Sequence, residues 1–429
     1  SSDLARTAAG MWRCGGESGR NHRGTRSIRV SGSSETRAVW LIAGLLTGLS
    51  LLNHLISPSS FHLSAEAWDD LLAYHRDFDV FRVRPVTTAV VGFLAEQTGL
   101  SVRSAFFLLQ FALFFVTGPA FYHFLRSLQF SPARSRAGMV ILLLSLPLFL
   151  AHFEPVWTWD DFWCYILLPS AMAFALGRRY WPAAACIAGA MIARETSAAF
   201  LPVLFLLFRT NPKVGIARPL LATLAPVAVL VVFRAAVLGA VSGSPVWSLA
   251  FNFESWARTR DSLFSLIVSL GFLWPVGLTQ AFRRPEESPA WYDAVRFGAL
   301  LTAGAYLVSG LLFGHIRESR LLLPPALLFI PLVLVYIEEN GRRLGELRAV
   351  AAPGPLRTAI ALGLLLAGSL LAAHGLFPSF EYRRWQDGNR LYFALHLALT
   401  AVFLGVEFMR RGRGRSPVGR RPGADARAA

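Results

Sequence analysis

The sequence has little charge for its length and almost no lysine. Only 16% of its 429 residues are charged, and Lys213 is the single lysine among 42 basic residues. Soluble domains carry closer to about a quarter of charged residues, so the composition argues against a soluble protein. The strong preference for arginine over lysine indicates a GC-rich bacterial genome, and we therefore expect a bacterial protein.

Cysteine is also scarce, and the short motifs of soluble enzymes are missing. The three cysteines, Cys14, Cys164 and Cys186, are scattered without paired spacing, which excludes a disulfide framework or a zinc knuckle. The chain contains no Walker loop, no GxGxxG after a strand, no HExxH and no CxxC. No soluble-enzyme motif therefore stands out.

Apolar residues dominate what remains. The chain is 54% hydrophobic, its mean hydropathy is +0.47, and apolar runs near spanning length recur from Ala38 to Met409. The sequence therefore predicts an all-α, polytopic transmembrane helical bundle over residues 38–409. The candidate spans are residues 38–56, 103–125, 137–152, 162–176, 219–239, 262–281, 295–313, 321–336, 356–375 and 391–409.

The stretch 181–208 is longer than one span needs and carries a charged pair in its middle. As one straight helix it would be roughly 42 Å long, whereas half-spans at about 181–193 and 197–208 would form a hairpin with Arg194 and Glu195 at its tip. The total is then about 11–12 spans, according to which solution holds. The charged pair either pins the turn as a structural ion pair or forms a wall of a polar cavity.

The arginines are concentrated near the two ends of the chain, in residues 1–37 and 410–429. Basic loops stay on the cytoplasmic side of a membrane, and the hairpin solution keeps both ends there. We therefore expect cytoplasmic, disordered terminal segments on a multi-pass plasma (inner) membrane protein. Topology, and not binding to nucleic acid, is our explanation for the net charge of +16.

In this topology the first external loop, residues 57–85, combines acids with arginines. If residues 64–75 form a helix, Glu66 and Asp70 share a face, while Asp69 points about 100° away. After Pro85 the stretch VTTAVVGFLAEQTGL is too short and too polar to span, so we expect an interfacial helix along the outer leaflet.

Further external segments bring more carboxylates and arginines to the same side. The turn HFEPVWTWDDFWCY holds Asp160 and Asp161 without a basic residue; this pair could ligate a divalent cation with one more oxygen donor, or serve topology or sugar binding. Arginines bind phosphate bidentately, and carboxylates can deprotonate a hydroxyl. Our candidate cavity residues are Asp160, Asp161, Arg194, Glu195, His315 and Glu318, and our candidate phosphate-binding residues are Arg82, Arg84, Arg317 and Arg320.

Three stretches carry a resemblance to a known superfamily. They are AWDDLLAYHRDF leading into FRVRP, GAMIARETSAAFLP, and HIRESRLLLPPALL. Together they resemble the GT-C superfamily of multispanning glycosyltransferases, which use polyprenyl-phosphate-linked sugars and include protein mannosyltransferases. The resemblance covers roughly residues 38–336 and implies that the catalytic base is Asp69 or Asp70.

The resemblance implies a membrane glycosyltransferase that moves a sugar from a polyprenyl-phosphate donor to an acceptor hydroxyl on the external face, with inversion. The donor, membrane lipids and a glycan, lipid or protein acceptor are then its partners, and a divalent cation is the one cofactor to consider. The alternative is a transporter or flippase of lipid-linked saccharides, because transporters also use broken helices at their sites.

Overall fold

The computed structural model describes the greater part of the 429-residue chain. The described residues are 33–56, 62–78, 82–149, 159–210, 215–238, 252–256, 258–259, 262, 270–285, 288–313, 323–351, 354–376 and 386–414. Internal contacts divide the chain into Ser1–Arg37 and Ala38–Ala429. The following description concerns the second unit, together with the helix that leads into it.

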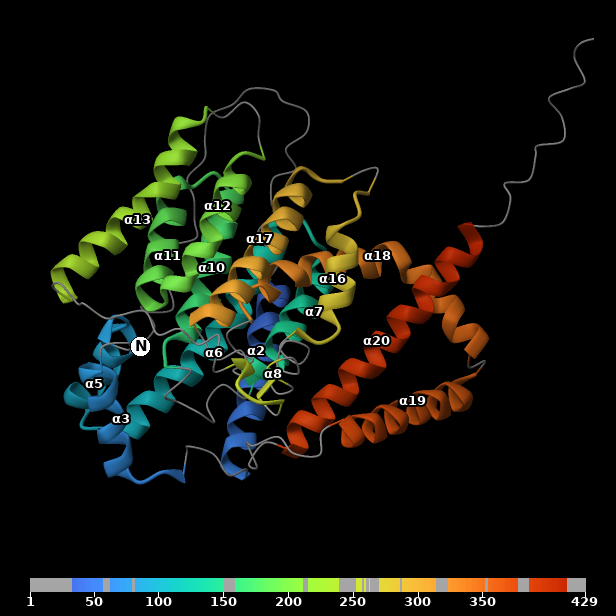
Figure 1. Cartoon of the computed structure of the whole chain (residues 1–429), viewed down its shortest axis with the longest axis horizontal. Helices are drawn as coiled ribbons and strands as arrows, with labels where there is room; N and C mark the ends of the chain where they lie inside the picture. The colour runs from blue at the N-terminus through green and yellow to red at the C-terminus, as the bar shows by residue number, and fades with distance from the viewer. Residues whose placement is uncertain are drawn as a thin grey trace, which may run out of the picture. The chain divides into compact units, whose positions relative to one another are not determined.

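The described residues are helical and contain no strand (Figure 1), which confirms the predicted all-α class. The helices are α2 (Ser33–Ile56), α3 (Ala65–Asp77), α5 (Val86–Thr98), α6 (Val102–Ser127), α7 (Pro132–Leu143), α8 (Leu146–Phe149), α10 (Asp161–Leu176), α11 (Tyr180–Ala193), η3 (Glu195–Phe200), α12 (Leu201–Phe208), α13 (Ala217–Leu238), α16 (Leu273–Ala281), α17 (Ala290–Phe313), α18 (Ala326–Ala351), α19 (Pro355–Leu376) and α20 (Gln386–Gly414).

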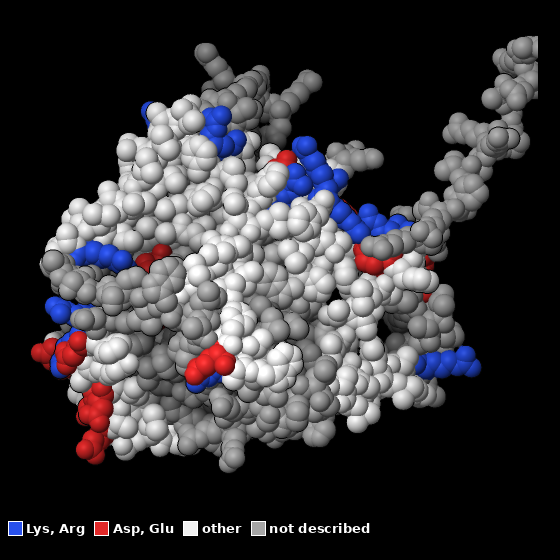
Figure 2. Space-filling model, viewed as in Figure 1, with Lys and Arg blue, Asp and Glu red and all other residues white. Residues whose placement is uncertain are grey.

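Four helices in the described part are long and apolar enough to cross a membrane: Ser34–Ile56, Val102–Ser127, Ala217–Ala236 and Ala290–Leu312. Shorter apolar helices cover Asp161–Leu176, Tyr180–Ala193, Glu195–Phe208 and Ala359–Ala372. On the face drawn in Figure 2, described surface without charged residues is extensive. These features are those of a membrane protein, because an uncharged apolar exterior matches a lipid environment.

The helices that carry the candidate site pack around α10. This helix packs along both α6 and α11, and α11 in turn packs against α13. Helices α3 and α5 lie against α6, where Trp68 of α3 is fully buried between the rings of Phe106, Phe107 and Trp159. Helix α3 is thus fixed to the bundle by an aromatic cluster, which orients the loop that follows it.

The stretch 181–208 reverses direction, as the hairpin solution predicted. Helix α11 ends at Ala193, Arg194 is extended with φ −157° and ψ 112°, and the 3₁₀ turn η3 leads into α12. The ring of Tyr180, at the start of α11, lies 4.9 Å from the ring of Phe208, at the end of α12. Because the two ends of the segment meet, the break at Arg194 is the tip of a hairpin.

Other boundaries differ from the prediction for local reasons. Residues 137–152 were expected to form one span, but α7 ends at Leu143 and the short α8 follows. The Ser145 hydroxyl donates to the Leu142 carbonyl and helps to end α7 there. Helix α18 continues to Ala351, far beyond the expected end at 336, because its last turns carry polar residues that can leave an apolar layer.

Candidate functional site

The first part of the site is the N-terminus of α5. Its N-cap is Pro85, which provides no side-chain cap, so the first N–H groups of the helix need another acceptor. The Asp160 carboxylate accepts the Thr87 backbone N–H at 3.1 Å, and the Thr87 hydroxyl donates to the Trp159 carbonyl at 2.8 Å. An acid from a distant segment therefore caps this helix, as the helix dipole favours.

The second part is an ion pair between neighbouring helix ends. Asp161 is the first residue of α10, and Arg194 is the C-cap of α11. The two helices pack together, and Asp161 pairs with Arg194. An acid at a helix N-terminus and a cation at a helix C-terminus are both favourable, which explains why this charged pair forms at the shared end.

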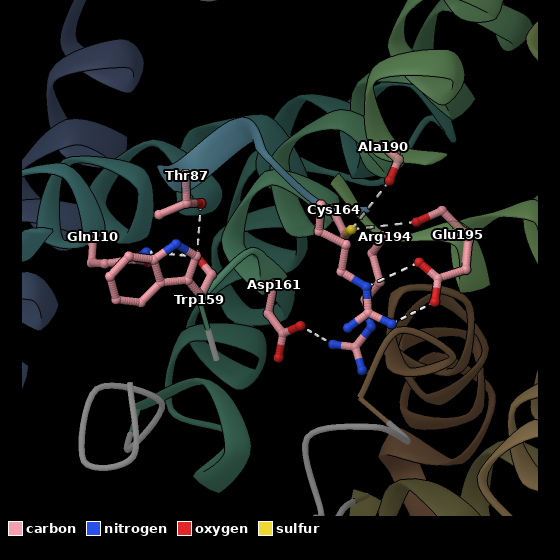
Figure 3. Close-up of polar contacts among 10 residues, drawn as sticks. Thr87, Gln110, Trp159, Asp161, Cys164, Ala190, Arg194 and Glu195 are labelled. Atoms are coloured by element: carbon pink, nitrogen blue, oxygen red, sulfur yellow. Dashed lines mark hydrogen bonds and ion pairs between the residues drawn. The ribbon is translucent and has the colours of Figure 1, made fainter. Parts of the chain in front are cut away.

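The third part is an arginine pair around Glu195. Arg84 Nε and Nη2 donate to the two Glu195 carboxylate oxygens at 3.0 and 2.5 Å. Arg234 of α13 approaches the same carboxylate, with Nη2 3.8 Å from Glu195 Oε2. Figure 3 shows Asp161 on one side of the Arg194 guanidinium and Glu195 on the other, with dashed lines at both carboxylates. We call Arg84, Asp160, Asp161, Arg194, Glu195 and Arg234 the hairpin cluster.

The hairpin cluster has a closed end and an open end. The side chains of Asp161 and Arg194 are each only 4% exposed. The side chains of Arg84, Glu195 and Arg234 are 20%, 32% and 39% exposed. The open end thus presents two arginines and one carboxylate, a net charge of +1, where a ligand can reach them.

Burial acts in opposite directions on the pKa values of the two loop residues of the cluster, Asp160 and Arg84. Burial raises the pKa of Asp160 to about 7, although the bonds from Thr87 and the charges of Arg84 and Arg194 lower it. Burial also lowers the pKa of Arg84, but the Glu195 carboxylate outweighs that effect and raises it above its ordinary value. Arg84 therefore stays charged, whereas Asp160 can exchange a proton near neutral pH.

The acids of the cluster are poor ligands for the divalent cation that Asp160 and Asp161 suggested. Asp161 is paired with Arg194, and Asp160 accepts the Thr87 N–H beside two arginines. Positive neighbours oppose a cation. In the part of the chain that is described, no group of three or more His, Cys, Asp or Glu side chains could hold a metal.

The structure brings together five of the residues singled out in the sequence, namely Arg84, Asp160, Asp161, Arg194 and Glu195. It does not bring the candidate bases Asp69 and Asp70 to them: both lie on the exposed face of α3. Arg82 also points elsewhere and is exposed beside a separate cleft. His315, Arg317, Glu318 and Arg320 lie outside the described residues.

Sequence analysis missed Arg234 and the polar residues that support the cluster. Arg234 occurs in the apolar run LAPVAVLVVFRAAVL, and an arginine inside a predicted span is itself a signal of function. Cys164 and Ser197 give no such signal. The Cys164 sulfur lies 3.3 Å from the Ser197 hydroxyl, so this contact also joins α10 and η3.

Comparisons with known proteins add no relative to this description. No protein-family model matches the chain, and neither the curated proteins nor the solved structures give a match. The geometry of the site and the chemistry of its residues are therefore the basis for a function.

Proposed function

We propose that the protein is an integral-membrane glycosyltransferase of the GT-C type, with about 11–12 spans and both termini in the cytoplasm. The donor is a sugar linked to a polyprenyl phosphate, and the acceptor is a hydroxyl group on the external face of a bacterial inner membrane. The open end of the hairpin cluster holds the donor phosphate.

The observation that carries the proposal is the accessible pair of arginines around Glu195. Arg84 is fixed by two bonds to Glu195, while Arg234 contacts the same carboxylate only at 3.8 Å. The Arg234 Nε is buried without a hydrogen-bond partner among the described residues. A phosphate that accepts from Arg234 and Arg84 would satisfy this donor and balance the positive charge of the open end.

The reaction places the developing charge at these arginines. A carboxylate takes the proton of the acceptor hydroxyl, and the acceptor oxygen attacks the anomeric carbon from the side opposite the phosphate. The bond between the anomeric carbon and the phosphate oxygen breaks, its electron pair leaves with the polyprenyl phosphate, and the anomeric centre inverts. Arginines stabilise such a leaving group because its negative charge increases in the transition state.

Two positions compete for the role of base. The resemblance assigns it to Asp69 or Asp70, which are accessible to an acceptor at the outer surface of α3. Asp160 is the acid whose raised pKa, about 7, suits proton transfer at neutral pH. Sugar transfer from a polyprenyl-phosphate donor in membranes, measured for Asp69→Asn, Asp70→Asn and Asp160→Asn, separates them.

The same assay tests the proposal itself. Arg234→Gln removes the positive charge of the open end but leaves the Arg84–Glu195 pair, so we expect donor KM to rise by about tenfold or more. Arg218→Gln, at the exposed start of the same helix, is the matched control. Wild-type kinetics in Arg234→Gln would remove the phosphate site from this cluster.

The broken helix also suits a transporter of lipid-linked saccharides, because discontinuous helices form transporter sites. Transport sites lie near the middle of the membrane. Arg194 lies at the break between α11 and η3, as such a site requires, whereas Asp161 starts α10 and Arg234 lies near the end of α13. Movement of a labelled lipid-linked saccharide across proteoliposomes, without sugar transfer, would favour the transporter.

A further inference from the structure

A second cleft lies beside the hairpin cluster, between the end of α3 and the start of α5. Its volume is about 470 Å³, and its lining residues are Leu72, His75, Arg76, Arg82, Pro85, Thr88, Ala89 and Gly92. Clefts of this size accept small molecules or the head groups of larger ones. The sequence placed Arg82 with Arg84 in a single phosphate site, but Arg82 borders this cleft while Arg84 binds Glu195.

Among the described residues that line the cleft, the charged ones are arginines. Arg76 and Arg82 both line it, and Asp77, which pairs with Arg76 through Nε at 3.0 Å, is largely exposed. An exposed ion pair of this kind contributes little, so a ligand with two or three anionic oxygens can displace Asp77 from Arg76.

The floor of the cleft is rigid and separates it from the hairpin cluster. The His75 ring is buried and stacks on Trp159 with centroids 4.2 Å apart and planes 12° apart. The Trp159 indole N–H donates to the Thr88 hydroxyl at 3.0 Å. The next residue in the chain, Asp160, caps α5 from the hairpin-cluster side. The two sites therefore share a wall but bind from different sides.

We propose that this cleft is a second anion site, which binds a phosphate group at Arg76 and Arg82, with the ligand body against His75, Leu72 and Ala89. Recognition depends on the paired guanidinium groups, which match phosphate oxygens in geometry and charge. The proposal does not require transferase activity, because it concerns binding alone.

The phosphate can belong to a lipid head group or to a soluble ester, and both sources share this chemistry. The test titrates the detergent-purified full chain with short-chain phosphatidic acid by calorimetry, and separately with inorganic phosphate. We expect phosphatidic acid to bind, with an affinity reduced about tenfold or more in the Arg76→Gln/Arg82→Gln double variant. Arg218→Gln, on α13 away from the cleft, should bind as the wild type does.

A variant without a charge change gives an independent check. A Cβ added at Gly92 meets no atom within 4 Å, and Gly92 lines the cleft, so we expect the side chain of Gly92→Leu to project into the cleft. We expect it to abolish binding while the unfolding temperature stays at or above that of the wild type, since glycine is a poor helix former.

Each outcome decides the proposal. Binding of phosphatidic acid that inorganic phosphate displaces supports the site and assigns recognition to the phosphate group itself. Binding that inorganic phosphate does not displace supports the site and assigns it to a lipid head group. If neither probe binds, or if binding survives both the double arginine variant and Gly92→Leu, the cleft is not an anion site.

Discussion

Two clusters of charge in this protein use the same kinds of side chain in different surroundings. In the hairpin cluster, Asp161 and Arg194 are each 4% exposed. In the second cluster, Arg283 binds both oxygens of Glu407 at 3.0 and 2.6 Å, with side chains 27% and 10% exposed. The Tyr336 hydroxyl also donates to Glu407 at 2.9 Å. Arg410 Nη1 lies 3.9 Å from Glu407 Oε1, and we call Arg283, Tyr336, Glu407 and Arg410 the α20 cluster.

The difference lies in what each cluster joins. The α20 cluster connects one residue after α16 and one on α18 to α20, so it fastens a late helix to its neighbours. The hairpin cluster connects a loop, two adjacent helix ends and α13, and it includes an acid of raised pKa. Buried ion pairs are weak sources of stability. A cluster that is buried at one end and open at the other is therefore better explained as a ligand-binding site than as a structural link between helices.

The largest effect should come from the closed end of the hairpin cluster. Arg194→Met removes the guanidinium that pairs with the buried Asp161 carboxylate, and breaking a buried pair in this way costs about 3–5 kcal/mol. We expect the greatest fall in unfolding temperature of the detergent-purified protein among the variants discussed. The control is the double variant Asp161→Leu/Arg194→Met, which should recover much of the loss, because no unpaired charge remains. If Arg194→Met unfolded at the same temperature as Arg283→Met, this ranking would be contradicted.

The next effect is a dependence on pH at Asp160. Its pKa is about 7 in the folded chain and 3.8 ordinarily, so the folded state holds the proton over an interval where the unfolded state has lost it. Stability therefore falls as pH rises from 3.8 to about 7 and stays reduced above that interval. At 1.36 kcal/mol per pH unit, the fall is at most about 4 kcal/mol.

Asp160→Asn isolates this contribution, because the amide oxygen can still accept the Thr87 N–H. We expect the variant to unfold at a higher temperature than the wild type at pH 8 and to show no advantage at pH 4. An equal difference between the two proteins at both pH values would mean that Asp160 is not the titrating group.

The sequence predicted the helical class from its hydropathy and favoured the hairpin from the positions of its basic residues. Arg84 and Glu195 could be singled out because arginine or glutamate near a membrane span is unusual. Their bidentate contact could not be predicted, because it joins residues 111 positions apart. Arg82 and Arg84 looked equivalent in the sequence, and only the packing of α3 and α5 directs them to different sites.

The α20 cluster should show a smaller effect than the hairpin cluster. Arg283→Met removes two hydrogen bonds to Glu407, but Tyr336 still donates to that carboxylate. We expect a loss of about 1.5–3 kcal/mol, seen as a lower unfolding temperature with unchanged donor KM. Tyr336→Phe, which keeps the arginine, should cost about 1 kcal/mol. A change in donor KM with Arg283→Met would contradict the distinction between the α20 cluster as a structural link and the hairpin cluster as a binding site.

The smallest effect should come from an exposed pair. Arg134 pairs with Glu338, and their side chains are 43% and 48% exposed. Because water screens such a pair, Arg134→Gln should cost at most about 1 kcal/mol, and the difference from wild type should vanish at high salt. Unfolding temperatures at low and high salt measure this. A loss of stability comparable to that of Arg283→Met, and independent of salt, would show that the exposure of a charged pair does not determine its contribution to stability. The comparison between the two clusters would then lose its basis.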